Sequence, residues 1–111
     1  MTQSTRVQEA QLSSLITDRW SPRSFTEDDV SSDQLTRLLE AARRAPSSFN
    51  IQPWHFIYAR KSDGEAYQNL FDCLMDANKG WAQLAPVLMI SVTQTNQNDG
   101  NPNYYARHDV G

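Results

Sequence analysis

The 111-residue sequence has little of what marks several large classes of protein. Its single cysteine, Cys73, cannot form an internal disulfide, which is typical of proteins from reducing compartments. No stretch approaches the ~20 consecutive apolar residues of a membrane-spanning helix. Residues 1–14 also lack the apolar run of a signal peptide. We therefore expect a cytoplasmic protein with no membrane partner.

Basic charge is scarce as well. Ten Lys and Arg residues stand against 13 Asp and Glu residues, which gives a net charge of −3. Because proteins that bind nucleic acid usually carry a basic excess, we expect no nucleic-acid partner. The 39% hydrophobic and 21% charged residues are ordinary for a globular protein, and the length allows one domain at most. A domain this small buries its core incompletely, so partner surfaces often complete it.

The first part of the chain carries the spacing of two amphipathic helices. We expect one helix from about Val7 to Asp18. Ser31 with Gln34 has the spacing of a capping box, which predicts the start of a second helix. That helix should stop at Pro46, because a proline ring disfavours helical geometry in the preceding residue. The predicted apolar faces are formed by Leu12, Leu15, Ile16 and Trp20, and by Leu35, Leu38, Leu39 and Ala42.

Two strands and one more helix are predicted from the rest of the chain. The stretch Trp54 to Ala59 alternates apolar and polar residues, as a half-buried strand does. Ser62 and Glu65 repeat the capping-box spacing and predict a helix that ends near Gly80. Val87 to Val92 is a continuous apolar run, typical of a central strand covered on both faces. Two strands make a marginal sheet, so we expect more chain.

Arg19 and Arg23 lie four residues apart with Ser21 between them. Arginine offers forked donors that match phosphate oxygens, and serine adds a neutral donor. Pro22 would hold the two guanidiniums in register. The residues therefore suit a phosphate site, although arginines that follow a surface helix are more often simply solvated.

The loop from Pro46 to Trp54 holds more polar groups than a connection requires. Two rigid prolines frame Ser47, Ser48 and Asn50. These side chains could serve a ligand, or they could merely cap a turn, with Asn50 in an Asx-turn.

No competing catalytic constellation is present. His55 and His108 lie far apart without metal-ligand spacing, and Cys73 falls inside a predicted helix. The stretch Thr93 to Asn103 is rich in Asn and Gln, which predicts a long exposed loop.

Three segments, in this order, make the sequence resemble the FMN-dependent nitroreductases. They are Arg19-x-Ser21-x-Arg23-x-Phe25, then Ala45-Pro46-Ser47-Ser48-x-Asn50-x-Gln52-Pro53-Trp54, and then Asn78-x-x-Trp81-x-x-x-Ala85-Pro86. The middle segment is the most specific, and the three together span residues 19–86. The last residues, His108-Asp109-Val110-Gly111, resemble the start of the family's long central helix.

The resemblance implies an α+β fold of the nitroreductase type, in which a mixed sheet is flanked by helices in three layers. Residues 1–111 would be the N-terminal part of one such domain, ending before the central dimer helix. The resemblance also implies a homodimer with two FMN sites, each built from both subunits.

The family's motifs also assign site residues, none of them a catalytic side chain or a metal ligand. Flavin phosphate, ribityl chain and pyrimidine edge would be held by Arg19, Trp20, Ser21 and Arg23. The loop residues Pro46, Ser47, Ser48 and Asn50 would approach the flavin bound mainly by the other subunit, and Asn78 and Lys79 would lie near the pyrimidine end. Gln52 and Trp54 are expected to anchor the loop.

The implied activity is transfer of two electrons from NADH or NADPH, through flavin N5, to a nitroaromatic or quinone-like acceptor by a ping-pong mechanism. Two alternatives stay open. One is a non-catalytic fragment that binds flavin or dimerises, and the other is a relative with different flavin chemistry, such as dehalogenation or heterocycle oxidation. The residues do not distinguish NADH from NADPH or identify the physiological acceptor.

Overall fold

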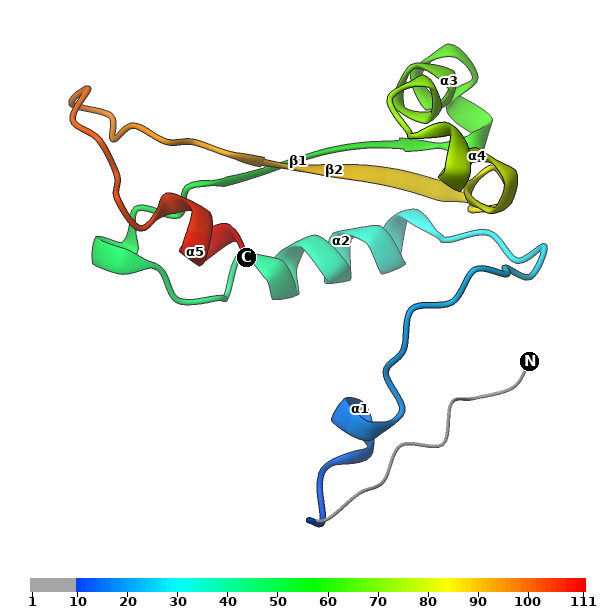
Figure 1. Ribbon diagram of the computed structural model, residues 1–111, viewed down its shortest axis with the longest axis horizontal. Helices are drawn as coiled ribbons and strands as arrows, with labels where there is room; N and C mark the ends of the chain where they lie inside the picture. Colours follow the sequence, from blue (N-terminus) through cyan, green and yellow to red (C-terminus); the bar gives the residue numbers. More distant parts are fainter. Residues whose placement is uncertain (1–9) are drawn as a thin grey trace.

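The computed structural model describes residues 10–111, which form an α+β arrangement around one antiparallel strand pair (Figure 1). Short 3₁₀ turns lie at Ser48–Asn50 and Lys61–Asp63. The regular elements are α1 (Ser14–Thr17), α2 (Ser32–Ala42), β1 (Trp54–Arg60), α3 (Glu65–Asp72), α4 (Asp76–Ala82), β2 (Val87–Thr93) and α5 (Ala106–Val110). None of the helices in this part of the chain has the length and apolar content needed to cross a membrane.

The two strands lie where the sequence predicts them. β1 and β2 pair antiparallel, with Trp54 opposite Thr93 and Arg60 opposite Val87. The expectation that the second strand is central is wrong within residues 10–111, where the sheet has two strands only. Met89 is 41% exposed and Ile90 is 37% exposed. The apolar run therefore leaves part of its surface uncovered, because α3 and α4 lie at one end of the pair (Figure 1).

The helix predicted between the strands is two helices. The chain is extended at Met75 (φ −63°, ψ 144°), which ends the first helical stretch and starts α4. Gly80 lies inside α4 and not at a helix end. The helix α3 begins after Gly64, whose φ of 59° suits a residue without a Cβ. The capping box expected at Ser62 is wrong for this reason.

Tyr67 ties α3 to the entrance of β2. Its hydroxyl donates to the Ala85 carbonyl at 2.6 Å, and the residue is 7% exposed. Burial raises the pKa of the Tyr67 phenol, because the phenolate would lose its hydration. This contact fixes the end of the strand pair that lies under α3 and α4.

The predicted start of α2 is confirmed. Gln34 N donates to Ser31 Oγ at 3.1 Å, and Ser31 N donates to Gln34 Oε1 at 2.8 Å, which completes the capping box. Of its predicted apolar face, Leu35 is buried at 4% exposure, but Leu38 is 59% exposed. The helix therefore buries only part of the stripe that its sequence offers.

The first helix is much shorter than predicted. The expected start at Val7 lies outside the described residues, and α1 is a single turn that begins after Ser13. Leu15 is 87% exposed and Ile16 is 63% exposed, so the predicted buried face is wrong for this segment. A short helix gains most of its stability from packing, and Figure 1 shows α1 projecting away from the strand pair.

Candidate functional site

The first predicted site segment is an open stretch of chain between α1 and α2. Arg19, Ser21 and Arg23 are exposed, and Trp20 is half-buried. Within residues 10–111, neither guanidinium takes part in an ion pair or a hydrogen bond. The N–H donors of both guanidiniums are therefore available to bind an anion such as a phosphate.

An aromatic stack joins this segment to α4. The rings of Phe25 and Trp81 lie 6.2 Å apart between centroids, with an interplanar angle of 20°. Offset stacking of this kind contributes beyond simple burial. Because α4 also carries Asn78 and Lys79, the stack brings the first and third sequence motifs to the same side of the molecule.

The two predicted site residues of α4, Asn78 and Lys79, differ in the contacts that they make. Lys79 Nζ lies 3.3 Å from Asp76 Oδ1 and 5.8 Å from the centre of the Phe71 ring. Asn78 is half-buried, and its backbone N–H donates to the Met75 carbonyl at 2.9 Å. The Lys79 ammonium is thus held in place along the helix by a carboxylate and a ring.

The loop after α2 has an unusual backbone. Phe49, Asn50 and Gln52 have φ values of 54°, 52° and 53°, in the left-handed region that non-glycine residues rarely adopt. Ser47 Oγ accepts the Gln52 N–H at 3.0 Å, and Gln52 Nε2 donates to the Arg43 carbonyl at 3.4 Å. The anchoring role expected of Gln52 is therefore confirmed, and the loop is held in one shape by its own polar groups.

A carboxylate on α5 also holds this loop. Asp109 Oδ2 accepts the Ser48 N–H at 2.9 Å, across 61 residues of sequence. The Asp109 side chain is only 9% exposed, and its other oxygen lies 3.5 Å from His108 Nδ1. The sequence indicated only that a helix begins here, so the contact between Asp109 and the loop was missed.

The structure does not bring the first motif and the loop together in one chain. The segment from Arg19 to Arg23 precedes the N-terminus of α2, and the loop from Pro46 to Asn50 follows its C-terminus. Figure 1 shows the two stretches leaving opposite ends of that helix. The ten predicted residues therefore form three groups: the segment that precedes α2, the loop that follows α2, and Asn78 with Lys79 on α4.

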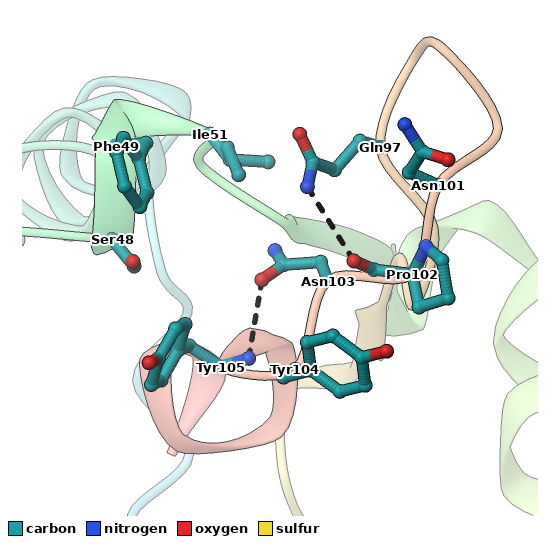
Figure 2. A pocket seen from close by; sticks show the side chains of 9 residues that line it. All are labelled: Ser48, Phe49, Ile51, Gln97, Asn101, Pro102, Asn103, Tyr104 and Tyr105. Carbon is teal, nitrogen blue, oxygen red and sulfur yellow. Dashed lines mark hydrogen bonds between the residues drawn. The ribbon is translucent and has the colours of Figure 1, made fainter.

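A pocket of about 380 Å³ lies beside the loop (Figure 2). One wall is formed by Ser48, Phe49 and Ile51, and the other by the segment from Gln97 to Tyr105. The sequence predicts only a long exposed loop over most of that segment. The sequence feature that could have indicated a pocket here is the aromatic pair Tyr104 and Tyr105, directly after the Asn-rich stretch.

The arrangement as a whole is that of a known class of flavoprotein fold. It is similar to a solved structure described as the crystal structure of the oxidoreductase containing FMN, with a TM-score of 0.87 and 36% sequence identity. The likeness covers 100% of this chain and 58% of the other. The predicted α+β, nitroreductase-like fold class is confirmed by this likeness.

The sequence also matches the profile of the Nitroreductase family over residues 16–106. This chain belongs to the nitroreductase family, as the three motifs predict.

Curated relatives match shorter parts of the chain. An oxygen-insensitive NADPH nitroreductase of Helicobacter acinonychis (strain Sheeba) is 40% identical over 50 residues, which is 44% of this chain and 24% of the relative. An NADH dehydrogenase of Thermus thermophilus is 45% identical over 42 residues, which is 38% of this chain and 20% of the relative. The matched region therefore spans about a quarter or less of these two relatives.

Proposed function

We propose that this chain is part of an FMN-dependent oxidoreductase that passes two electrons from NADH or NADPH to a nitroaromatic or quinone-like acceptor in a ping-pong cycle. The observation that carries the proposal is the pair of exposed guanidiniums, Arg19 and Arg23, without protein partners in residues 10–111. Family membership and the FMN-containing structural relative give that anion site a candidate occupant.

The residues of the first group fit the phosphate end and the polar edge of FMN. Arg19 and Ser21 would donate to phosphate oxygens, in the way that forked and hydroxyl donors do elsewhere. Arg23 would place a positive charge beside the pyrimidine edge, with Asn78 and Lys79 on the neighbouring helix. When bound, FMN supplies the exchange of two electrons. The chain itself binds and orients, and needs no nucleophile for that task.

Two copies of the chain would complete each site. The first motif and the loop leave opposite ends of α2, which supports a site that a second copy completes. In a homodimer, Pro46, Ser47, Ser48 and Asn50 of one copy would approach the flavin held by Arg19, Trp20, Ser21 and Arg23 of the other. The rigid, polar loop suits that role, because ordered donors need not be immobilised on binding.

A non-catalytic role in flavin binding or dimerisation is the second candidate. The exposed apolar residues of α1, Leu15 and Ile16, favour it, because apolar surface of this kind is typical of a contact region. We also propose that residues 1–111 are the N-terminal part of one nitroreductase-like domain. A cytoplasmic location stays a prediction from the sequence.

The test is flavin retention followed by turnover. The 111-residue chain and the product of the complete reading frame would be incubated with FMN and desalted, and their visible absorbance recorded. We expect the complete product to keep FMN-like absorption and to oxidise NADH or NADPH when a quinone is added. Flavin retention without turnover would favour the non-catalytic candidate, and absence of flavin from both proteins would contradict the proposal.

A further inference from the structure

We propose that a groove between α3 and the turn before β2 binds a free aliphatic monocarboxylate, such as a short-chain fatty acid. The groove has a volume of about 410 Å³. It lies at the end of the strand pair where α3 and α4 pack (Figure 1). None of the residues predicted for the flavin site lines it. The inference therefore does not rest on the proposed flavin activity, and it concerns another kind of ligand.

One wall of the groove is a single stripe along α3. Its residues are Gly64, Tyr67, Gln68 and Phe71, whose spacing of three and four places them on one face of the helix. The stripe covers two helical turns, roughly 10 Å, which is enough for an extended chain of about six carbon atoms. The two rings make this wall largely apolar.

The facing wall is the turn that joins α4 to β2. Leu84 lines the groove and is 52% exposed, although the backbone beside it is held in place. The Tyr67 hydroxyl donates to the Ala85 carbonyl at 2.6 Å, and Lys61 N donates to the Pro86 carbonyl at 2.9 Å. These two bonds fix the turn against α3 and against the 3₁₀ turn before it. Because the walls are set before a ligand arrives, the entropic cost of binding is lowered.

A free ammonium supplies the charge of the groove. Lys61 lines it, and within residues 10–111 its side chain takes part in no ion pair or hydrogen bond. The amide donors of the lining are already used, since Gln68 Nε2 donates to Asp72 Oδ1 at 2.8 Å and Gln83 Nε2 donates to the Gly80 carbonyl at 3.1 Å. A carboxylate would therefore bind at Lys61, and its single negative charge matches one ammonium.

The hydrocarbon part of the ligand would then lie on Phe71 and Leu84. Each methylene group that moves from water onto these side chains adds to the affinity. The second lysine, Lys79, lies 5.8 Å from the centre of the Phe71 ring, but it pairs with Asp76 at 3.3 Å and does not line the groove. Lys61 is thus the cation that orients the ligand.

The proposal is tested by titrating the ¹⁵N-labelled 111-residue chain with sodium hexanoate and following the backbone amide signals of Gln68 and Leu84 by NMR. We expect both signals to move and to saturate. Two comparison ligands separate the contributions, because 1-hexanol lacks the charge and butanoate lacks two methylene groups. Each should bind about threefold more weakly or worse.

Lys61→Gln removes the charge and keeps most of the stem. Its affinity for hexanoate should fall about threefold or more, while its affinity for 1-hexanol should not change. Arg37→Gln is the matched control, because it also removes one positive charge from an exposed helix residue, and it should bind hexanoate as the unaltered chain does. Leu84→Ser should weaken both ligands, and Leu38→Ser, at a residue of α2 that is 59% exposed, should weaken neither.

Three outcomes would overturn the proposal. The first is that the Gln68 and Leu84 signals stay in place while those of Arg19 to Arg23 move, which would put the carboxylate on the predicted phosphate site. The second is equal hexanoate affinity in Lys61→Gln and the unaltered chain. The third is a loss of hexanoate affinity when FMN is added, because the groove is expected to bind the carboxylate equally well with and without flavin.

Discussion

The two parts of the molecule that carry the predicted site are held in different ways. The loop after α2 is fixed on several sides by its own chain, through Ser47, Gln52 and Asp109. The segment from α1 to Arg23 has a single turn of helix with Leu15 87% exposed. Just beyond it, the stack of Phe25 on Trp81 links the chain to the body of the molecule.

The difference shows which part of the site this chain can shape alone. The loop owes its geometry to hydrogen bonds and left-handed residues that are already in place. The arginine segment presents guanidinium donors without a protein partner in residues 10–111, next to the exposed apolar side chains of α1. The following predictions separate the two regions, beginning with the largest effect.

Leu35→Ala should lower the free energy of unfolding by about 2–4 kcal/mol, because it removes a buried side chain and leaves a cavity. Leu15→Ala, in the exposed turn of α1, should change it by less than about 0.5 kcal/mol. Urea denaturation of the chain measures both. Equal losses in the two variants would mean that α1 is packed as firmly as α2.

Arg19→Ala should weaken FMN binding by ~1.5–3 kcal/mol in the form of the protein that retains flavin, the scale of a charge-assisted contact. Fluorescence titration with FMN measures the change. Arg37→Ala is the matched control, because Arg37 pairs with Asp33 on the exposed surface of α2 at 3.0 Å. An affinity for FMN that is the same in Arg19→Ala as in the unaltered protein would remove this segment from the flavin site.

Asp109→Ala should cost about 1–2 kcal/mol and should speed hydrogen exchange at the Ser48 amide, which loses its acceptor. Asp109→Asn keeps an acceptor oxygen and should have a smaller effect. His108→Ala, on the same helix with its side chain 92% exposed, should leave the Ser48 amide as protected as before. Unchanged exchange at Ser48 in Asp109→Ala would show that the loop is held by other contacts.

Ser31→Ala should cost about 1 kcal/mol, because it removes one half of the capping box of α2. Ser13→Ala tests the weaker cap of α1, where Leu15 N lies 3.4 Å from Ser13 Oγ. It should lower the free energy of unfolding by a few tenths of a kcal/mol at most. Thermal unfolding of the two variants compares the caps directly. A larger loss in Ser13→Ala would reverse the order of stability proposed for the two helices.

The smallest effect concerns alkaline pH. Burial raises the pKa of Tyr67 above its ordinary value of 10.0, so the folded chain keeps this proton after the unfolded chain has lost it. The contribution of Tyr67 to stability is therefore complete below that value and falls as pH rises above it. In Tyr67→Phe, the free energy of unfolding should depend less on pH in this range. The measurement compares the free energies of unfolding of the variant and the unaltered chain as the pH is raised. Parallel profiles for the two would contradict the assignment.

Local signals predicted the parts of the fold that depend on neighbouring residues. The Ser31 and Gln34 pair predicted its capping box correctly, and the alternation from Trp54 predicted β1. The motif residues identified the family. These features are visible in the sequence because their partners lie within a few residues, or because the spacing itself is distinctive.

Features that the local sequence pattern does not report were missed. The break at Met75 has no proline or glycine beside it, so the apolar spacing suggested a continuous helix. The length of α1 depends on packing, which spacing does not report. The contact of Asp109 with Ser48 arises only when two remote segments meet.

The bond between Ser48 and Asp109 also bears on the order in which the chain folds. Its ends are 61 residues apart, and the strand pair from Trp54 to Thr93 lies wholly between them. Closing so long a stretch is slow when it is unstructured, and pairing the strands first shortens the remaining path. We expect the loop to take up its final shape late in refolding, after the strand pair has formed. Ligand sites that use the loop would then appear only in the last kinetic phase.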